Sequence, residues 1–181
     1  FGFLDKHKDV DVPVLSVTGW YDQQIGTIKQ FTGMVKNGMT EHARSNQRLI
    51  VGPWTHTVTG MNQRLGDMDF GPEAVRDYFQ IADDWFAYWL KGESRGVEEW
   101  PPIQLFVMGA NAWRGEQEWP LARTRYTDFY LHSGGSANTP GGHGVLAAEP
   151  PGDESTDEYV YDPRDPVMTL FTQPGQYEPH D

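Results

Sequence analysis

The chain has no cysteine among its 181 residues and few basic side chains, 14 against 26 acidic ones. The lack of cysteine excludes disulfides, thiolate metal ligands and a thiol nucleophile within these residues. The formal net charge of −12 argues against a nucleic-acid-binding surface, which needs clustered Lys and Arg. There is no run of about 18 apolar residues, so no membrane-spanning segment is expected.

Charge is distributed unevenly along the chain. Residues 1–92 carry 9 basic and 11 acidic side chains, net −2, whereas residues 93–181 carry 5 Arg, no Lys and 15 acids, net −10. This shift predicts two differently built parts. The chain begins with Phe1 and not with Met, so a leader would lie upstream, and the compartment, cytoplasmic or secreted, stays open.

The first half has the pattern of alternating strands and helices. The run Val12–Thr18 is largely apolar and is interrupted by Ser16, which predicts a parallel strand covered on both faces. A helix is expected over residues 25–36, ending at Asn37-Gly38 as a left-handed cap, and residues 48–51 predict the next strand. These segments form one β-α-β unit, whose right-handed crossover makes the two strands parallel.

A second helix is expected to begin at Gly71-Pro72 and to end at Lys91-Gly92, since Pro suits a first helical position and Gly suits a stop. Its apolar residues recur at helical spacing and are interpreted as core, with a binding groove as the alternative: Val75, Tyr78, Ala82, Trp85 and Trp89. Beyond Gly92, short β-rich runs at residues 103–108, 125–132 and 158–162 alternate with turns rich in Gly, Pro and Asn. That pattern predicts an all-β sandwich or jelly roll.

Two polar side chains follow the two predicted parallel strands. The run VLSVTGWYD ends in Asp22, and the run RLIVGPWTH ends in His56. Open α/β sheets bind ligands beyond the carboxyl ends of their strands. An Asp that accepts a hydrogen bond from one imidazole nitrogen leaves the other nitrogen free to take a proton from a nucleophile. The order Asp before His also matches the last two members of the α/β-hydrolase triad.

Each of these residues also has a simpler interpretation. Asp22 stands directly before a predicted helix and would serve as its N-cap, and His56 in a loop would be merely hydrogen-bonded. The aromatic neighbours of the pair, Trp20, Tyr21 and Trp54, would line an acyl pocket or pack in the core, and the sequence favours neither. Catalysis becomes a working hypothesis because one topology explains the placement of both Asp22 and His56.

Seven segments in order, VPVLSVTGWYD, LIVGPWTH, WFAYWLKG, IQLFVMGANAWR, EWPLA, FYLHSGG and YVYDPRDPV, resemble the X-Pro dipeptidyl-peptidase and cocaine-esterase family of serine hydrolases. That family also contains α-amino-acid ester hydrolases. The resemblance implies the C-terminal part of an α/β-hydrolase domain over residues 1–95 and the first part of a jelly-roll domain over residues 96–181. It makes Asp22 the triad acid and His56 the general base. Small-molecule ester, amide or peptide substrates are implied, and neither a metal nor an organic cofactor is.

No Gly-x-Ser-x-Gly nucleophile elbow is expected within these residues. Ser16 lies inside a strand, and Gly134-Gly-Ser136-Ala-Asn138 lacks the final Gly of a nucleophile elbow. The Ser and the oxyanion donors are therefore expected in an upstream part of the hydrolase domain, and residues 1–181 alone are expected to be inactive. A proline-specific dipeptidyl aminopeptidase and a non-catalytic ligand-binding β-sandwich module remain alternatives. The sequence leaves open the substrate and whether the protein forms homo-oligomers.

Overall fold

The computed structural model describes residues 6–22, 25–56, 61–139 and 141–166. These residues form two compact units, one up to Ala122 and one from Arg123 onward. The first unit is built on a four-stranded sheet with strand order β1-β2-β5-β6, and the second on a two-stranded sheet. Within the described ranges, no helix is both long and apolar enough to cross a membrane.

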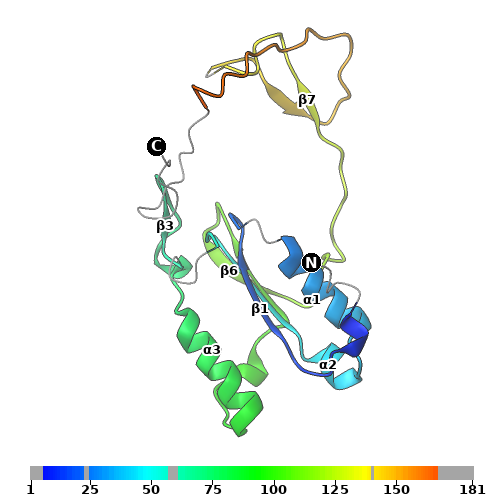
Figure 1. Ribbon diagram of the computed structural model, residues 1–181, viewed down its shortest axis with the longest axis vertical. Coiled ribbons are helices and arrows are strands. Elements are labelled where there is room, and N and C mark those ends of the chain that lie inside the picture. Colours follow the sequence, from blue (N-terminus) through cyan, green and yellow to red (C-terminus); the bar gives the residue numbers. More distant parts are fainter. Residues whose placement is uncertain (1–5, 23–24, 57–60, 140, 167–181) are drawn as a thin grey trace. The chain divides into compact units, whose positions relative to one another are not determined.

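The central sheet confirms the predicted β-α-β unit (Figure 1). Its strands are β1 (Leu15–Gly19), β2 (Arg48–Gly52), β5 (Ile103–Val107) and β6 (Ala112–Glu116). β1 and β5 both lie parallel to β2, and β6 lies antiparallel to β5. The first strand begins at Leu15, three residues later than Val12, where the sequence predicts it.

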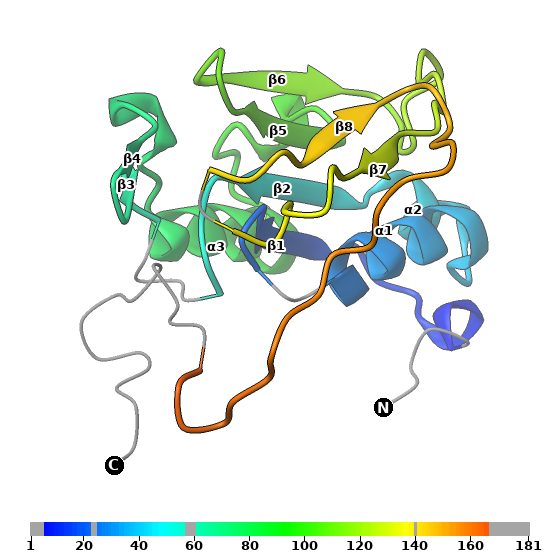
Figure 2. The same ribbon diagram turned by 90° about the horizontal axis from the view of Figure 1, so that it is seen from above.

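Helices cover both faces of this sheet, with α1 on one side and α3 on the other (Figures 1 and 2). The helices of the unit are α1 (Ile25–Asn37), α2 (Glu41–Ser45) and α3 (Tyr78–Phe86). Along β2, Leu49 and Val51 pack with Phe31 of α1, whereas Ile50 packs on the opposite face with Tyr78 of α3. A strand buried on both faces needs apolar residues at every position, which explains the unbroken apolar run from Leu49 to Val51.

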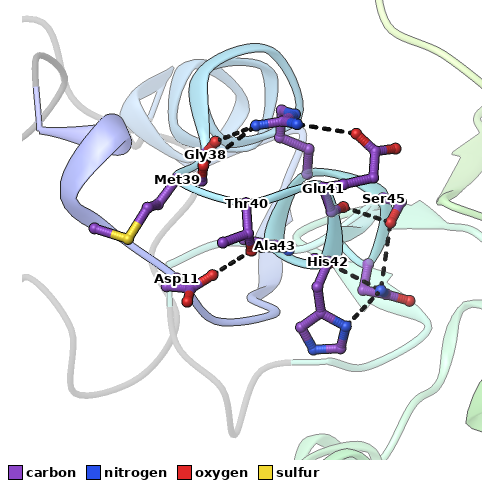
Figure 3. Close-up of polar contacts among 10 residues, drawn as sticks. Asp11, Gly38, Met39, Thr40, Glu41, His42, Ala43 and Ser45 are labelled. Atoms are coloured by element: carbon purple, nitrogen blue, oxygen red, sulfur yellow. Dashed lines mark hydrogen bonds and ion pairs between the residues drawn. The ribbon is translucent and has the colours of Figure 1, made fainter.

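Side-chain hydrogen bonds close the corner between α1 and α2 (Figure 3). Thr40 is the N-cap of α2: its hydroxyl oxygen accepts a hydrogen bond from the Ala43 N–H at 3.1 Å, and the hydroxyl donates to Asp11. The Arg44 guanidinium donates to the Gly38 carbonyl at 2.8 Å. The Asp11 contact joins the segment before β1 to the helical crossover that leads into β2.

The second predicted helix is divided in the structure. Residues Pro72–Ala74 form a separate 3-10 turn, η3, and α3 begins only at Tyr78. Asp77 is the N-cap of α3, and its carboxylate accepts two backbone N–H bonds of the first turn. The prediction of a helix start at Pro72 is wrong because Val75 adopts an extended conformation, and its side chain is 50% exposed and not in the core.

After Gly92, the strand pairing differs from the separate β domain that the sequence predicts. Strand β5 pairs in parallel with β2, so β5 and β6 belong to the first compact unit. The break in packing follows Ala122 and does not lie near residue 95. The second unit contains an antiparallel pair, β7 (Tyr130–His132) and β8 (Val145–Ala147), whereas residues 158–162 form no strand.

The remaining short elements are η1 (His7–Asp9), β3 (Arg64–Leu65), β4 (Met68–Asp69), η4 (Ala87–Lys91) and η5 (Val97–Glu99).

The imidazole of His7 packs directly on α1. His7 is 4% exposed, and its Nε2 lies 3.0 Å from Gln30 Oε1. A Cβ added to Gly33 would lie 2.2 Å from the His7 Cε1. Glycine is therefore required in the middle of α1, where it would otherwise weaken the helix.

We expect Gly33→Ala to lower the free energy of unfolding by about 1–3 kcal/mol, because the new methyl group displaces the imidazole. Urea unfolding measures this change. Gly26→Ala is the matched control in the same helix, since a Cβ there meets no atom within 4 Å, and it should cause no loss. In a His7→Ala background, Gly33→Ala should no longer destabilise the protein; a persisting loss would contradict the His7 packing.

His132 of β7 holds the loop that follows β8. Its Nδ1 lies 2.6 Å from a Glu154 carboxylate oxygen, and its Nε2 lies 2.9 Å from the Glu149 carbonyl oxygen. Both partners are acceptors, so both contacts are satisfied only when both ring nitrogens carry protons. The hydrogen bond that His132 donates to Glu154, followed by the one that it donates to the Glu149 carbonyl, raises the pKa of His132. The Ser133 N–H and then His132 lower the pKa of Glu154.

These two pKa shifts set the pH range in which the contact stabilises the loop. A raised His pKa adds stability that is complete below the unfolded value of 6.5 and is lost as the pH rises through the folded value. A lowered Glu pKa adds stability above the unfolded value of 4.5 that is lost as the pH falls. The contact is therefore strongest between pH 4.5 and 6.5.

An NMR titration should give His132 a pKa above 6.5, and Glu154→Gln should lower that pKa. The control Asp153→Asn removes a neighbouring charge without removing the contact and should change the pKa far less. A His132 that titrates at or below 6.5 in the unsubstituted protein would contradict the assignment.

Candidate active site

Two glycines end the adjacent strands β1 and β2 and are register partners, Gly19 opposite Gly52. A Cβ on Gly19 would lie 2.0 Å from the Trp54 carbonyl oxygen, and a Cβ on Gly52 would lie 2.5 Å from the Trp54 indole. Both positions require glycine because the backbone and ring of Trp54 pass directly over the two strand ends.

Backbone hydrogen bonds continue past the ends of these strands. The Trp20 N–H donates to the Gly52 carbonyl at 2.9 Å, and the Tyr21 N–H donates to the Trp54 carbonyl at 3.1 Å. The Asp22 N–H turns back to the Gly19 carbonyl at 3.0 Å, which closes a four-residue turn. The main chain thus joins the turn that carries Asp22 to the loop that leads to His56.

Asp22 and His56 meet above the two strand ends, as the sequence predicts. His56 Nδ1 lies 3.2 Å from Asp22 Oδ1 and 3.3 Å from Oδ2. The Asp22 side chain is 7% exposed and the His56 side chain 70% exposed. A proton on Nδ1 satisfies the carboxylate and leaves Nε2 for proton exchange. The contact is long for a hydrogen bond, as is common for catalytic pairs before substrate binds.

A cavity of about 590 Å³ opens beside this pair. Asp22 and His56 line it together with β1 and with one face of α3, from which Tyr78, Trp85 and Phe86 contribute. Its volume is within the range of small-molecule sites. Asp22 is the only carboxylate among the described residues that line the cavity. A convergent Asp–His pair beside an open cavity favours a hydrolase over a module in which both residues are structural.

The three aromatic neighbours of the pair lie elsewhere. Trp54 is 2% exposed, and its indole N–H donates to a backbone carbonyl at 2.8 Å. Trp20 is half-buried with a similar bond at 2.8 Å, and the Tyr21 hydroxyl contacts the Met68 sulfur at 3.4 Å. None of the three, all of which are described, lines the cavity. They pack in or against the core, and the aromatic wall of the cavity comes from α3, which the sequence assigns to the core.

One Gly-x-Ser-x-Gly pattern is nevertheless present in the sequence. Gly92-Glu93-Ser94-Arg95-Gly96 matches Gly-x-Ser-x-Gly in every position. A nucleophile elbow needs a strand before the serine and a helix after it. Here Gly92, with φ 68°, ends the π-helical turn η4, and Gly96, with φ 78°, precedes the 3-10 turn η5. The Ser94 hydroxyl donates to Glu98. The pattern therefore marks a helix-to-helix turn and not an elbow.

A second serine contacts a histidine in the second unit. Ser136 Oγ lies 2.7 Å from His143 Nδ1, and His143 is exposed. Among the described residues, no carboxylate contacts the His143 ring, so this pair lacks the acid that orients a catalytic histidine. The described ranges also contain no group of three His, Cys, Asp or Glu side chains that could hold a metal ion.

The parallel strands with their helical crossover, and the β-rich residues that follow, agree with the hydrolase fold and C-terminal β domain that two family matches indicate. Residues 2–58 match the family model of X-Pro dipeptidyl-peptidase (S15 family), and residues 95–176 match the X-Pro dipeptidyl-peptidase C-terminal non-catalytic domain. A cocaine esterase of Rhodococcus sp. strain MB1 is 39% identical over 163 residues, which cover 87% of this chain and 27% of the esterase. The chain belongs to the X-Pro dipeptidyl-peptidase and cocaine-esterase family.

Two further relatives agree with this membership. A protein of Mycobacterium bovis named as a serine esterase is 27% identical over 158 residues, covering 82% of this chain and 21% of that protein. The crystal structure of an aminopeptidase from a marine sediment archaeon, Thaumarchaeota archaeon, superposes with a TM-score of 0.62 at 25% identity, covering 87% of this chain and 24% of the aminopeptidase. The chain spans about a quarter of the length of these relatives.

Because the Trp54 backbone packs on Gly19, a side chain at position 19 would cause a clash that no rotamer change can relieve. Gly19→Ala places a methyl group against backbone atoms of Trp54, so we expect a loss of about 1–3 kcal/mol in stability, larger than that of Gly33→Ala, whose clash is with a side chain. Thermal unfolding of both variants beside Gly26→Ala gives the ranking. An equal or smaller loss for Gly19→Ala would mean that Trp54 does not cross the end of β1 as described.

Proposed function

We propose that this chain supplies the acid and the base of a serine hydrolase that cleaves acyl esters or amides. Asp22 is the acid that orients His56, and His56 is the general base. The proposal rests on one observation above all, the Asp22–His56 contact at the ends of two parallel strands beside a cavity. Membership of a family that includes a cocaine esterase supports the same reaction class.

In the proposed mechanism, the Asp22 carboxylate accepts a hydrogen bond from the His56 Nδ1–H, which keeps that proton on Nδ1 and so fixes the tautomer of His56. Nε2 takes the hydroxyl proton of a serine as its Oγ attacks the substrate carbonyl carbon. His56 then gives this proton to the leaving alcohol or amine, and an acyl-enzyme remains. A water molecule, deprotonated by His56, attacks the acyl carbon, and the serine oxygen leaves with the proton held on His56. The carboxylic acid is released and the serine is restored.

The nucleophilic serine and the oxyanion donors belong, in this proposal, to a part of the hydrolase domain outside these 181 residues. The turn around Ser94 and the contact of Ser136 with His143 both lack the geometry of an elbow, which supports this placement. The cavity beside Asp22 is lined by β1, an edge strand of the described sheet. An edge strand can take a further strand of the same domain as its neighbour.

Small-molecule esters are the substrate class that we propose first. The identity of 39% with a cocaine esterase supports them. A dipeptidyl aminopeptidase would need an anionic group for the free amino terminus of its substrate. Asp22 is the only carboxylate among the described lining residues, and it already bonds His56. The peptidase alternative would therefore depend on residues outside this chain.

For the domain organisation we propose that residues 1–95 belong to the catalytic domain and residues 96–181 to the first part of a jelly roll. The start of the second family match at residue 95 supports this division. The antiparallel pair β7–β8 is also of the kind that jelly rolls contain. The pairing of β5 with β2 then places the first strands of the β domain against the catalytic sheet.

An active-site label tests the proposed catalytic pair. A fluorophosphonate reacts with an activated serine when Oγ forms a bond to phosphorus, fluoride leaves and the general base takes the proton. In the whole protein, we expect the label on a serine outside residues 1–181. His56→Gln and Asp22→Asn should each lower both the labelling and the hydrolysis of p-nitrophenyl acetate. For His56→Gln the loss should exceed about a thousandfold.

Three matched variants serve as controls for this experiment. His42→Gln changes an exposed histidine of α2, and Ser94→Ala and Ser136→Ala remove the two serines discussed above. All three should retain labelling and esterase activity. Labelling of Ser94 or Ser136, or full labelling of the His56→Gln variant, would refute the proposed function.

A further inference from the structure

Thr18 is a polar residue at a buried position of β1. It is 8% exposed, and its register partner is Val51 of β2. Leu15 and Val17 pack toward the α3 face, so the alternation of side chains along a strand directs Thr18 to the α1 face, where Val51 also packs. A valine has the same shape, favours strands equally and carries no hydroxyl to desolvate. The hydroxyl of Thr18 therefore needs a partner.

That partner is the Asp22 carboxylate. The Thr18 hydroxyl donates to Asp22 Oδ2 at 3.2 Å. His56 Nδ1 approaches both carboxylate oxygens, at 3.2 Å from Oδ1 and 3.3 Å from Oδ2. Thr18 and His56 thus bind the same carboxylate from two elements, one from inside strand β1 and one from the loop after β2. Thr18 lies within a strand of the central sheet and is 8% exposed, whereas the His56 side chain is 70% exposed.

We propose that Thr18 is a positioning residue for the general base. Its hydroxyl fixes the rotation of the Asp22 carboxylate about the Cβ–Cγ bond, so that an oxygen stays opposite His56 Nδ1. Thr18 touches neither the substrate nor the transferred proton and acts only through Asp22. This inference rests on the proposed function and extends it by one residue.

The physical reason lies in the length of the Asp22–His56 contact. At 3.2 Å a hydrogen bond weakens quickly when the acceptor turns away from the donor. If the carboxylate rotates, the proton of neutral His56 is no longer held on Nδ1, and Nε2 is then protonated in a larger fraction of molecules. A histidine with its proton on Nε2 cannot accept the serine proton. Loss of the Thr18 hydroxyl should therefore lower the fraction of competent base.

The test compares Thr18→Val with Thr18→Ser in the whole protein. Thr18→Val keeps the shape and removes the hydroxyl, and we expect kcat for p-nitrophenyl acetate to fall roughly tenfold with little change in KM, as for loss of a hydrogen bond to a charged group. Thr18→Ser keeps the hydroxyl and should stay within about twofold of the unsubstituted protein. If Thr18→Val does not fold, Thr18→Ala compared with Thr18→Ser differs by the hydroxyl alone.

Two readouts separate positioning from a general loss of structure. Nitrogen-15 NMR of histidine-labelled protein, with His56 assigned by the His56→Gln variant, reports which ring nitrogen carries the proton. We expect Thr18→Val to move the proton population from Nδ1 toward Nε2, and Thr18→Ser to leave it unchanged. In an Asp22→Asn background, Thr18→Val should have no further effect on kcat, because the residue through which it acts is already changed.

The outcomes distinguish this inference from the proposed function. If Asp22→Asn and His56→Gln abolish activity while Thr18→Val leaves both kcat and the His56 tautomer unchanged, the positioning role is wrong and the proposed function stands. If Asp22→Asn and His56→Gln leave activity intact, the proposed function is wrong. A further tenfold loss for Thr18→Val in the Asp22→Asn background would show a structural effect and would overturn the positioning role.

Discussion

The passage of Trp54 over the glycines that end β1 and β2 is the constraint on which the candidate site depends. Gly19 and Gly52 are register partners, and a Cβ on either would overlap Trp54. Because the chain crosses the strand ends this closely, the Trp54 carbonyl can accept the Tyr21 N–H. His56, two residues after Trp54, then lies opposite the turn that ends in Asp22. The Asp–His contact follows from this backbone path.

The difference in exposure between the two residues suits the proposed division of roles. An acid that only orients its partner works best when it is held in place, and the Asp22 side chain is nearly buried and hydrogen-bonded to Thr18 of strand β1. A base that exchanges protons with a substrate must be accessible, and the His56 side chain is 70% exposed. Burial of the acid also removes competing water from the carboxylate, which strengthens each hydrogen bond that it accepts.

Sequence similarity and structural compactness divide the chain at different residues. The family match to the C-terminal domain begins at residue 95, whereas the compact units of the structure separate after Ala122. Between these points lie β5 and β6, which continue the sheet of β1 and β2. An open parallel edge presents unpaired N–H and C=O groups, and an apolar strand that reaches it will pair there. The backbone hydrogen bonds between β2 and β5 therefore join residues on the two sides of the domain boundary at residue 95.

The sequence by itself determines the β-α-β unit, the family and the order of Asp22 and His56, because apolar runs, caps and short motifs are local patterns. It does not determine that Trp54 is buried, that Gly33 must admit the His7 ring, or that β5 pairs with β2, since each depends on segments far apart in the chain. The match around Ser94 shows the same limit, because its letters fit an elbow while its backbone joins two helical turns. Only the tertiary structure decides which local patterns meet, because packing and hydrogen bonding act between neighbours in space.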